Sequence, residues 1–479
     1  MREKRMPAFP GSVRIIDPLP ERERLGGLRK MKRFLIAMTL ILAAGAVCAQ
    51  SLAGYVTPFN AASPALQGGS SWTLPVVFEN AGFLKLHLGS LRLAGGERLE
   101  LRDGSDPGRT IKVIEGPFDG ACWLPSVDGG IAVIRVESLG NAAFTVDRVG
   151  VGFSERDDAA TDERVCGNDD RQDPACFDST LKGIGDKVGR ILFEANGTMH
   201  YCTGFLAGAD GLFVTAQHCI YDEDVAATAE VRWKYEKTSC GGEAEDFDTV
   251  SSGCQLVMAD PDTDLALLRF SGDNPASRYG YLELDNREPE KDEVIWIPQH
   301  PAGDAKKFAV HSDSDGGATV IAKSLVGVRV LQAIGYNLDV EAGSSGAPVI
   351  DSDNKVLAVH AFTALDEECE NPDLNRGIRM DILYPKIEPY ISTCSGTQPV
   401  ITKLRYAPSE RVFKLTGTGF TEESVILVDG VVQSTKLRKN GKLAAAMYDK
   451  LLRGDTVRVE VFSPDTGCLS DEVFYTRPL

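Results

Sequence analysis

The amino-acid sequence predicts an all-β protein, because residues 83–88 and 97–102 near the amino end alternate apolar and polar residues with a period of two, and residues 131–136 indicate a further strand. Similar segments, separated by turns, recur after residue 400. With 479 residues the chain exceeds what one ordinary hydrophobic core can hold, so roughly three domains are expected. We therefore expect several β-rich domains in succession, preceded by a leader.

Residues 1–49 form the expected leader. Met31 begins a segment with a basic start, an apolar run and a Val-Cys-Ala end, which is typical of a secretory signal peptide cleaved after Ala49. Residues 1–30 are rich in Arg and Pro without an apolar period, so we take Met31 as the true start. The alternatives are a membrane anchor, for which the apolar run is short, and a lipoprotein site at Cys48, which the preceding Gly-Ala-Val matches poorly.

Composition excludes some classes of function. The chain carries 69 acidic and 51 basic residues, for a formal charge of -18, which argues against a nucleic-acid partner and favours cationic substrates. A hydrophobic content of 43% is ordinary for a globular protein. We expect a secreted protein without a membrane span.

Residues 50–155 are expected to form a β-sandwich with a turn at Asp103-Gly104. The Leu-Glu-Leu-Arg-Asp-Gly sequence at 99–104 resembles CUB-like domains. The sequence leaves open whether this region is a prodomain, a folding aid or a substrate-binding module. The charged segment 154–164 is expected to be an exposed linker, and self-cleavage after Arg156 or Arg164 is a hypothesis.

A serine at the centre of a glycine-rich loop is the first candidate for chemistry. In the loop 341–349, glycines on both sides of the pair Ser344-Ser345 allow a tight turn that aims two backbone N–H groups at one point. Ser345 would attack a carbonyl carbon there, and the N–H groups of Gly343 and Ser345 would hold the oxyanion. Alone, such a loop is equally consistent with a surface turn, so the prediction depends on partners elsewhere in the chain.

Two such partners lie upstream. The apolar segment 212–219 predicts a buried strand that ends at His218, and the segment 262–269 places Asp264 at the start of another apolar strand. A carboxylate in that position can accept a hydrogen bond from an imidazole. The chain order is His, Asp, Ser, which is the order of the chymotrypsin-like serine peptidases.

The motifs around these residues resemble the chymotrypsin-like, or trypsin-like, serine peptidases, and within them the bacterial lysyl endopeptidases. The likeness covers about residues 160–395 and rests on these stretches: Thr-Ala-Gln-His-Cys at 215–219, Asp-Leu-Ala-Leu-Leu at 264–268, Gly-Ser-Ser-Gly-Ala-Pro at 343–348, Val-Cys at 165–166 with Cys176, Val231–Cys240, Gln-His-Pro at 299–301 and Val-Leu-Ala-Val-His at 356–360. It implies a chymotrypsin-like double β-barrel. The triad would be His218, Asp264 and Ser345. Unlike the best-known enzymes, the chain has Ser344 rather than aspartate before the nucleophile, so no activating pair with a new amino terminus is expected.

Of eleven cysteines, ten follow the leader, and an even number in an exported chain predicts disulfides. The resemblance implies three bonds: Cys166 to Cys369, Cys176 to Cys240 and Cys202 to Cys219. For Cys254 a bond to Cys394 and a bond to Cys240 both stay open. The partners of Cys122 and Cys468 are not predicted.

The resemblance also indicates a specificity pocket. A buried carboxylate at its base would select Lys or Arg. Asp373 lies close to where lysyl endopeptidases carry such an aspartate, with a spacing that differs by one, and Asp339 is the candidate if the pocket is built as in trypsin. The alternative is that both are solvated loop residues. His360 corresponds to a histidine that lines the pocket in lysyl and in glutamyl endopeptidases, so it marks the pocket without fixing the charge of the substrate.

The carboxyl-terminal region, residues 398–479, is expected to form a further β-domain. Its Gly-x-Gly-Phe sequence at 417–420 and Val-Asp-Gly at 428–430 resemble an IPT/TIG immunoglobulin-like domain. Such modules bind or space rather than catalyse.

The sequence thus predicts a secreted serine endopeptidase that cleaves after Lys or Arg, with a double β-barrel between two β-sandwich modules. It would act on proteins or peptides without a metal or other cofactor, and the histidines lack metal-ligand spacing. The alternatives are a serine endopeptidase with a preference for Glu and a catalytically silent binding or adhesion protein. The oligomeric state is not predicted.

Overall fold

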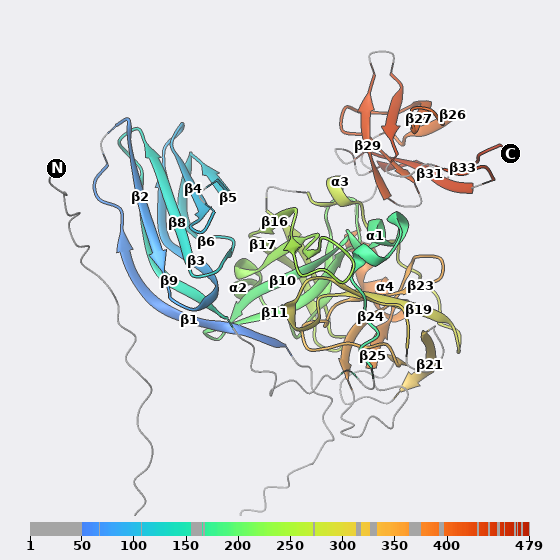
Figure 1. Cartoon of the computed structure of the whole chain (residues 1–479), viewed down its shortest axis with the longest axis horizontal. Helices are drawn as coiled ribbons and strands as arrows, with labels where there is room; N and C mark the ends of the chain where they lie inside the picture. The colour runs from blue at the N-terminus through green and yellow to red at the C-terminus, as the bar shows by residue number, and fades with distance from the viewer. Residues whose placement is uncertain are drawn as a thin grey trace, which may run out of the picture. The chain divides into compact units, whose positions relative to one another are not determined.

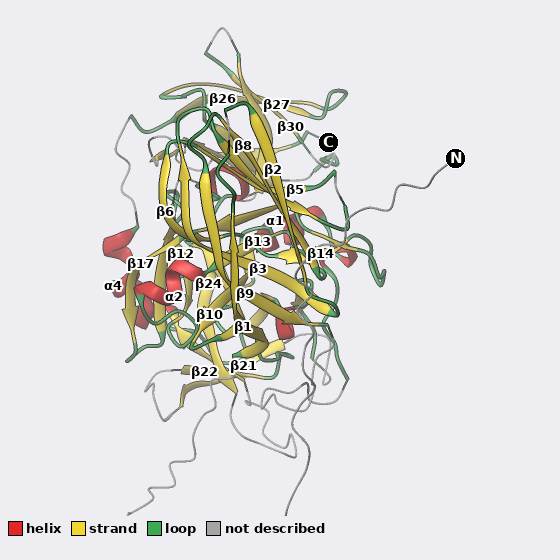
Figure 2. Ribbon diagram, turned by 90° about the vertical axis from the view of Figure 1, so that its left-hand side faces the viewer, coloured by secondary structure: helices red, strands yellow, loops and turns green. Residues whose placement is uncertain are grey.

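The computed structural model describes residues 50–66, 68–106, 108–154, 165, 168–271, 274–312, 318–325, 333–363, 375–391, 397–428, 431–438, 441–447, 451–454, 456–463, 466, 468–470 and 473–478. Within these ranges β-strands predominate and helices are short, as Figure 2 shows, so the predicted all-β class is confirmed. The predicted signal peptide at 31–49 and the cleavage points after Arg156 and Arg164 lie outside the described residues.

The amino-terminal region contains two sheets that face a common core. Its strands are β1 (Ser51–Ala62), β2 (Ser70–Val77), β3 (Ala81–Leu93), β4 (Arg98–Asp103), β5 (Thr110–Glu115), β6 (Phe118–Trp123), β7 (Val127–Asp128), β8 (Ile131–Ser138) and β9 (Ala143–Phe153). One sheet has the order β2-β8-β4-β5, and the strands β1-β9-β3-β6 belong to the other. Apolar side chains at alternate positions, such as Leu99 and Leu101 of β4 and Ile134 and Val136 of β8, are fully buried between them. The period-two pattern of the sequence therefore marked the inward faces.

The first half of the central region is a curved antiparallel sheet. Its elements are η2 (Pro174–Cys176), α1 (Ser179–Gly185), β10 (Val188–Ala195), β11 (Thr198–Leu206), β12 (Phe213–Ala216), α2 (Glu223–Thr228), β13 (Glu230–Trp233), β14 (Glu236–Lys237), β15 (Glu245–Asp246), β16 (Thr249–Ser252), β17 (Cys254–Asp260), β18 (Leu265–Phe270) and α3 (Ala276–Tyr279). β10, β11, β12 and β18 pair in that order. The helices α1 and α2 begin after Asp178 and Asp222, whose side chains accept hydrogen bonds from the first-turn N–H groups.

The second half of the central region closes into a barrel. Its elements are β19 (Val294–Gln299), η3 (Pro301–Gly303), β20 (Lys307–Ala309), β21 (Ala318–Leu325), β22 (Ala333–Tyr336), β23 (Pro348–Asp351), β24 (Val356–Thr363), β25 (Asn375–Arg379), α4 (Met380–Ile387) and η4 (Glu388–Tyr390). The ring closes because β23, the last strand in the order β19-β21-β22-β25-β24-β23, also pairs with β19. Buried side chains from both halves, among them Val214 and Val359, share one core cluster. The fold class expected for the central region is confirmed.

Strand β1 belongs to both the amino-terminal and the central sheets. Gly54 to Ala62 pair with β9, while Ser51 to Tyr55 pair with β11, with Ser51 opposite Tyr201. The two regions consequently share one 12-stranded sheet. Figure 1 shows β1 extending from the amino-terminal strands to β11. At the changeover only glycine fits, because a Cβ on Gly54 would lie 2.1 Å from the carbonyl oxygen of Val151. The sequence analysis did not predict this shared strand.

The carboxyl-terminal region is an eight-stranded sheet with its own core. Its strands are β26 (Val400–Ala407), β27 (Val412–Thr418), β28 (Val425–Val428), β29 (Val431–Leu437), β30 (Leu443–Ala446), β31 (Thr456–Ser463), β32 (Cys468–Leu469) and β33 (Val473–Thr476). Fully buried Phe413, Leu415 and Val459 lie at the centre of the core. The strands expected after residue 400 are therefore present.

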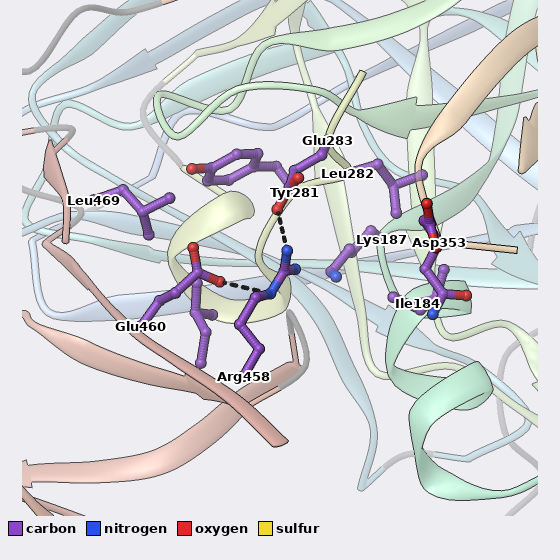
Figure 3. A pocket seen from close by; sticks show the side chains of 11 residues that line it. Ile184, Lys187, Tyr281, Leu282, Glu283, Asp353, Arg458, Glu460 and Leu469 are labelled. Carbon is purple, nitrogen blue, oxygen red and sulfur yellow. Dashed lines mark ion pairs between the residues drawn. The ribbon is translucent and has the colours of Figure 1, made fainter. Parts of the chain in front are cut away.

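A small pocket lies at the junction of the central and carboxyl-terminal regions (Figure 3). Arg458 of β31 pairs there with Glu283 at 3.1 Å and with Glu460 at 3.3 Å. Lys187 also lines the pocket, and its burial lowers its pKa from 10.5 to about 8. Charged groups therefore occupy this junction.

Among the described residues, no helix has the length and apolar character needed to cross a membrane.

Candidate active site

His218 and Asp264 are held together by two contacts. His218 follows β12, whose four residues are all buried, and Asp264 directly precedes β18, which pairs with β12. Nδ1 of His218 lies 2.8 Å from Oδ2 of Asp264, and the backbone N–H of His218 donates to Oδ1 at 2.8 Å. Both residues are largely buried, at 9% and 6% exposure. The carboxylate thus fixes the orientation of the imidazole and favours a proton on Nδ1.

The loop that carries Ser345 packs directly against the strands that precede His218. The carbonyl oxygen of Ser345 accepts a hydrogen bond from the N–H of Thr203 in β11 at 2.9 Å, and Sγ of Cys219 lies 3.9 Å from the same oxygen. A Cβ on Gly346 would lie 2.2 Å from the carbonyl oxygen of Thr203 and 2.4 Å from the hydroxyl of Thr215. Ser345 therefore lies beside Cys219, which follows His218 directly in the chain, although Cys219 and Ser345 are 126 positions apart in sequence.

The loop at 341–349, called the nucleophile loop after the role that the sequence predicts for Ser345, also has the turn needed to present backbone N–H groups. Gly343 and Gly346 adopt left-handed φ angles of 101° and 88°, which favour glycine. Ser344 donates its N–H to the carbonyl oxygen of Glu341 at 2.9 Å. Within the described ranges, no residue accepts a hydrogen bond from the N–H of Gly343 or Ser345. The hydroxyl of Ser345 is buried and likewise has no partner among the described residues.

Two residues that the sequence analysis did not identify hold this loop. Gln299, at the end of β19, accepts a hydrogen bond from the hydroxyl of Ser344 at 2.5 Å and donates to the carbonyl oxygen of Asp339 at 2.7 Å. Thr203 donates its hydroxyl to the carbonyl oxygen of Gly343 at 2.8 Å. Only the Gln-His-Pro motif at 299–301 offered a signal for Gln299, and none existed for Thr203. Ser344, which stands where the best-known chymotrypsin-like enzymes have an aspartate, thus has a side-chain partner in Gln299.

His360 lies next to the nucleophile loop, in β24. Its backbone carbonyl accepts from Gly346 and its N–H donates to Ala347, both at 2.8 Å. The hydroxyl of Tyr336 lies 2.7 Å from Nδ1 of His360. Burial, reinforced by the nearby His218, lowers the pKa of His360 from 6.5 to about 3. His360 is therefore neutral at physiological pH.

Of the two aspartates that the sequence offers for the specificity pocket, the structure describes only Asp339. Asp339 is buried, but its Oδ2 accepts a hydrogen bond from the backbone N–H of Asp170 at 2.9 Å. Burial raises the pKa of Asp339 to about 6, although this hydrogen bond and Arg171 act in the opposite direction. Arg171 also pairs with Glu341 at 2.8 Å. Asp339 thus contacts the segment that begins the central region, while Asp373 lies outside the described residues.

The disulfides confirm part of the expected pattern. Cys176 is bonded to Cys240 and Cys202 to Cys219, as expected. Cys166, Cys369 and Cys394 lie outside the described residues.

The expectation for Cys254 was wrong. Its thiol is free and buried, in contact with the carbonyl oxygen of Ala229 at 3.7 Å, and Cys240 is already bonded to Cys176. Cys254 packs in the buried core cluster of the first sheet. Cys122 is free as well, and Cys468 is disulfide-bonded.

Comparison with known proteins finds similarity to a peptidase family within the central region. The family model "Lysyl endopeptidase, C-terminal domain" matches residues 168–376. The chain is 34% identical over 206 residues to secreted RxLR effector protein 73 of Plasmopara viticola, which covers 41% of this chain and 50% of that protein. It is 28% identical over 175 residues to lysyl endopeptidase of Pseudomonas aeruginosa, which covers 34% of this chain and 37% of that protein. The chain spans half or less of these relatives.

Two solved structures are also similar. A Glu endopeptidase in complex with MPD is 16% identical, with a TM-score of 0.34, and covers 47% of this chain and 98% of that chain. Deg5 is 17% identical, with a TM-score of 0.32, and covers 45% of this chain and 94% of that chain. The family match itself relates residues 168–376 to lysyl endopeptidases.

Proposed function

We propose that this protein is a secreted serine endopeptidase that cleaves peptide bonds after Lys or Arg, with Ser345, His218 and Asp264 as its catalytic residues. The observation that carries the proposal is the paired contact of His218 with Asp264, beside a loop that packs Ser345 against the same strands. The match of residues 168–376 to a lysyl endopeptidase domain supports it.

In the proposed reaction, Oγ of Ser345 attacks the carbonyl carbon of the scissile bond while Nε2 of His218 takes the hydroxyl proton. The oxyanion that forms accepts hydrogen bonds from the N–H groups of Gly343 and Ser345. The imidazolium, stabilised by Asp264, then gives its proton to the leaving amine. Water hydrolyses the acyl-enzyme by the same steps, with His218 again as the base.

The preference for a basic residue has separate support. The surplus of acidic residues in the chain would attract cationic substrates. Asp373 is the proposed carboxylate at the base of the pocket, because Asp339 is engaged by Asp170.

Secretion is proposed on two grounds. The bonds Cys176–Cys240 and Cys202–Cys219 form in oxidising compartments. The relative from Plasmopara viticola is named as a secreted protein. Residues 31–49 would supply the export signal.

The test is digestion of a mixed peptide library by the purified protein, with products identified by mass spectrometry. Cuts after Lys or Arg are expected, and they should be lost in Ser345→Ala and kept in Ser352→Ala, an exposed serine nearby. Asp373→Asn should raise KM for basic substrates. Cuts after Glu would contradict the proposed preference, and no cuts at all would favour the catalytically silent binding protein.

A further inference from the structure

The amino-terminal region is joined to the central region by an edge-to-edge strand pairing. The register of β1 with β11 continues the backbone hydrogen bonds of the central sheet into the amino-terminal one, and the N–H of Val56 donates to the carbonyl oxygen of Gly197 at 2.8 Å. Behind this pairing, Ala53 and Phe83 form a buried cluster with Leu192 and Met199 of β10 and β11. Cleavage of the linker at 155–164 would leave all of these contacts in place.

An ionic cluster reinforces the pairing. It is formed by the buried residues Lys85, Ser126, Glu230 and Arg232 and by Asp128, whose side chain is half exposed. Lys85 donates to Glu230, and both side chains are fully buried. The N–H and hydroxyl of Ser126 donate to the same carboxylate at 2.7 and 2.5 Å. Arg232, beside Glu230 on β13, pairs with Asp128 at 2.7 Å. The central region thus contributes one acid and one base, and the amino-terminal region satisfies both.

The start of β1 reaches the loops of the candidate active site. The side-chain amide of Gln50 donates a hydrogen bond to the backbone carbonyl of His218. The hydroxyl of Ser51 donates to the carbonyl oxygen of Ala302 at 3.3 Å. Ala302, in turn, donates its N–H to Ala342, next to Gly343, at 2.6 Å. These two residues contact both the loop that carries His218 and the turn that supports the proposed oxyanion hole.

We propose that residues 50–154 are a permanent working part of the peptidase, and that Gln50 and Ser51 are positioning residues for the His218 loop and the nucleophile loop. This inference rests on the proposed function. Even if the linker is cut, the amino-terminal region stays bound and the first strand keeps both loops in place. It is therefore not a prodomain that must leave for the enzyme to act.

The first test cuts the linker in the otherwise complete chain. A recognition site for a specific protease replaces residues 156–163, the protein is cleaved, and the products are passed through a gel-filtration column at neutral pH. The two fragments should elute together with the activity of the uncut protein. If they separate and the larger fragment alone retains full activity, the inference is overturned.

The second test isolates the two positioning residues. Gln50→Met keeps the length of the side chain but removes its donor, and Ser51→Ala removes the hydroxyl. Each should lower kcat about three- to tenfold, the range expected for one lost hydrogen bond, with KM for a short peptide unchanged. Asn60→Ala, an exposed position further along β1, is the matched control and should leave kcat unchanged.

If Gln50→Met and the control Asn60→Ala have equal thermal unfolding midpoints, a lower kcat in Gln50→Met is due to lost positioning and not to lost folding. Unchanged kcat in both Gln50→Met and Ser51→Ala would refute the positioning role. Labelling by a fluorophosphonate, which reacts with activated serines, is run alongside with Ser345→Ala as blank. If the uncut protein neither cleaves peptides nor labels, the proposed function fails, while co-elution of the fragments still decides whether the region is permanently bound.

Discussion

Both oxygens of the Asp264 carboxylate are directed at one residue. Oδ1 accepts the backbone N–H of His218 and Oδ2 faces its ring, so the carboxylate fixes the position and the rotation of the imidazole together. Asp264 reaches this position with a left-handed φ of 52°, unusual for a residue other than glycine. Strained backbone of this kind is retained where the surrounding structure requires it.

Replacing Asp264 by Asn should lower kcat by about 10⁴-fold with little change in the fold, because the amide favours the wrong tautomer of His218. Steady-state kinetics with a lysyl peptide substrate would measure the loss. Asp262→Asn changes an exposed carboxylate two residues away and should retain activity. Comparable losses in the two variants would show that charge in this turn, rather than the contact with His218, matters.

At the scale of elements, the nucleophile loop fits against β11 and β12 through a glycine. Gly346 has a positive φ, and its Cα faces backbone and side-chain atoms of both strands at distances that exclude a methyl group. Gly197, in the turn between β10 and β11, also has a positive φ, but a Cβ there would meet no atom within 4 Å. A substitution at Gly197 therefore introduces backbone strain alone, whereas a substitution at Gly346 introduces backbone strain and a steric clash.

Gly346→Ala should therefore destabilise the protein by about 3 kcal/mol or more and abolish peptidase activity, because the loop must move away from Thr203. Gly197→Ala should cost only about 1 kcal/mol, the strain of the left-handed backbone. Urea unfolding followed by fluorescence would give both values. Equal losses in the two variants would contradict the packing argument.

Elements with a strong local pattern were predictable from the sequence. Alternating residues located β3 and β4, an apolar run located β8, and the apolar runs beside His218 and Asp264 placed each of them at the end of a strand. The pairing of those two strands came from the structure. The shared strand was not predictable, since β1 carries no signal for which of two sheets it joins. From the sequence, Lys85 and Glu230 would each be predicted to be exposed charges on a strand, but in the structure they are buried and paired with each other. Long-range packing also places Cys254 in a buried position where its thiol is free, whereas the even number of cysteines had suggested a disulfide.

At the scale of the whole molecule, the junction with the carboxyl-terminal region contains an unfavourable charge. Burial lowers the pKa of Lys187 from 10.5 to about 8, despite the nearby Glu283. Between these pH values the unfolded chain binds more protons at this lysine than the folded chain does, so stability rises with pH across the window. Below pH 8 Lys187 is charged in both the folded and the unfolded chain, and its burial lowers the free energy of unfolding by about 3 kcal/mol.

Lys187→Met should accordingly raise the free energy of unfolding at pH 7 by up to about 3 kcal/mol, and Arg458 would still pair with Glu283 and Glu460. The gain should shrink as the pH rises from 8 to 10.5. Urea unfolding across this pH range would measure it, with Lys442→Met as an exposed control. A gain independent of pH would instead indicate better apolar packing.

The pairing of Ser51 with Tyr201 also sets an order of events during protein synthesis. These partners are 150 positions apart, so β1 leaves the ribosome well before β11 exists. At ordinary rates of elongation this interval lasts roughly 10 to 30 seconds. During that time the start of β1 is an unpaired edge, and the loops it contacts have not yet been made. The chain therefore cannot complete its proposed catalytic centre until the loop of Ser345 has been made, long after β1 has left the ribosome.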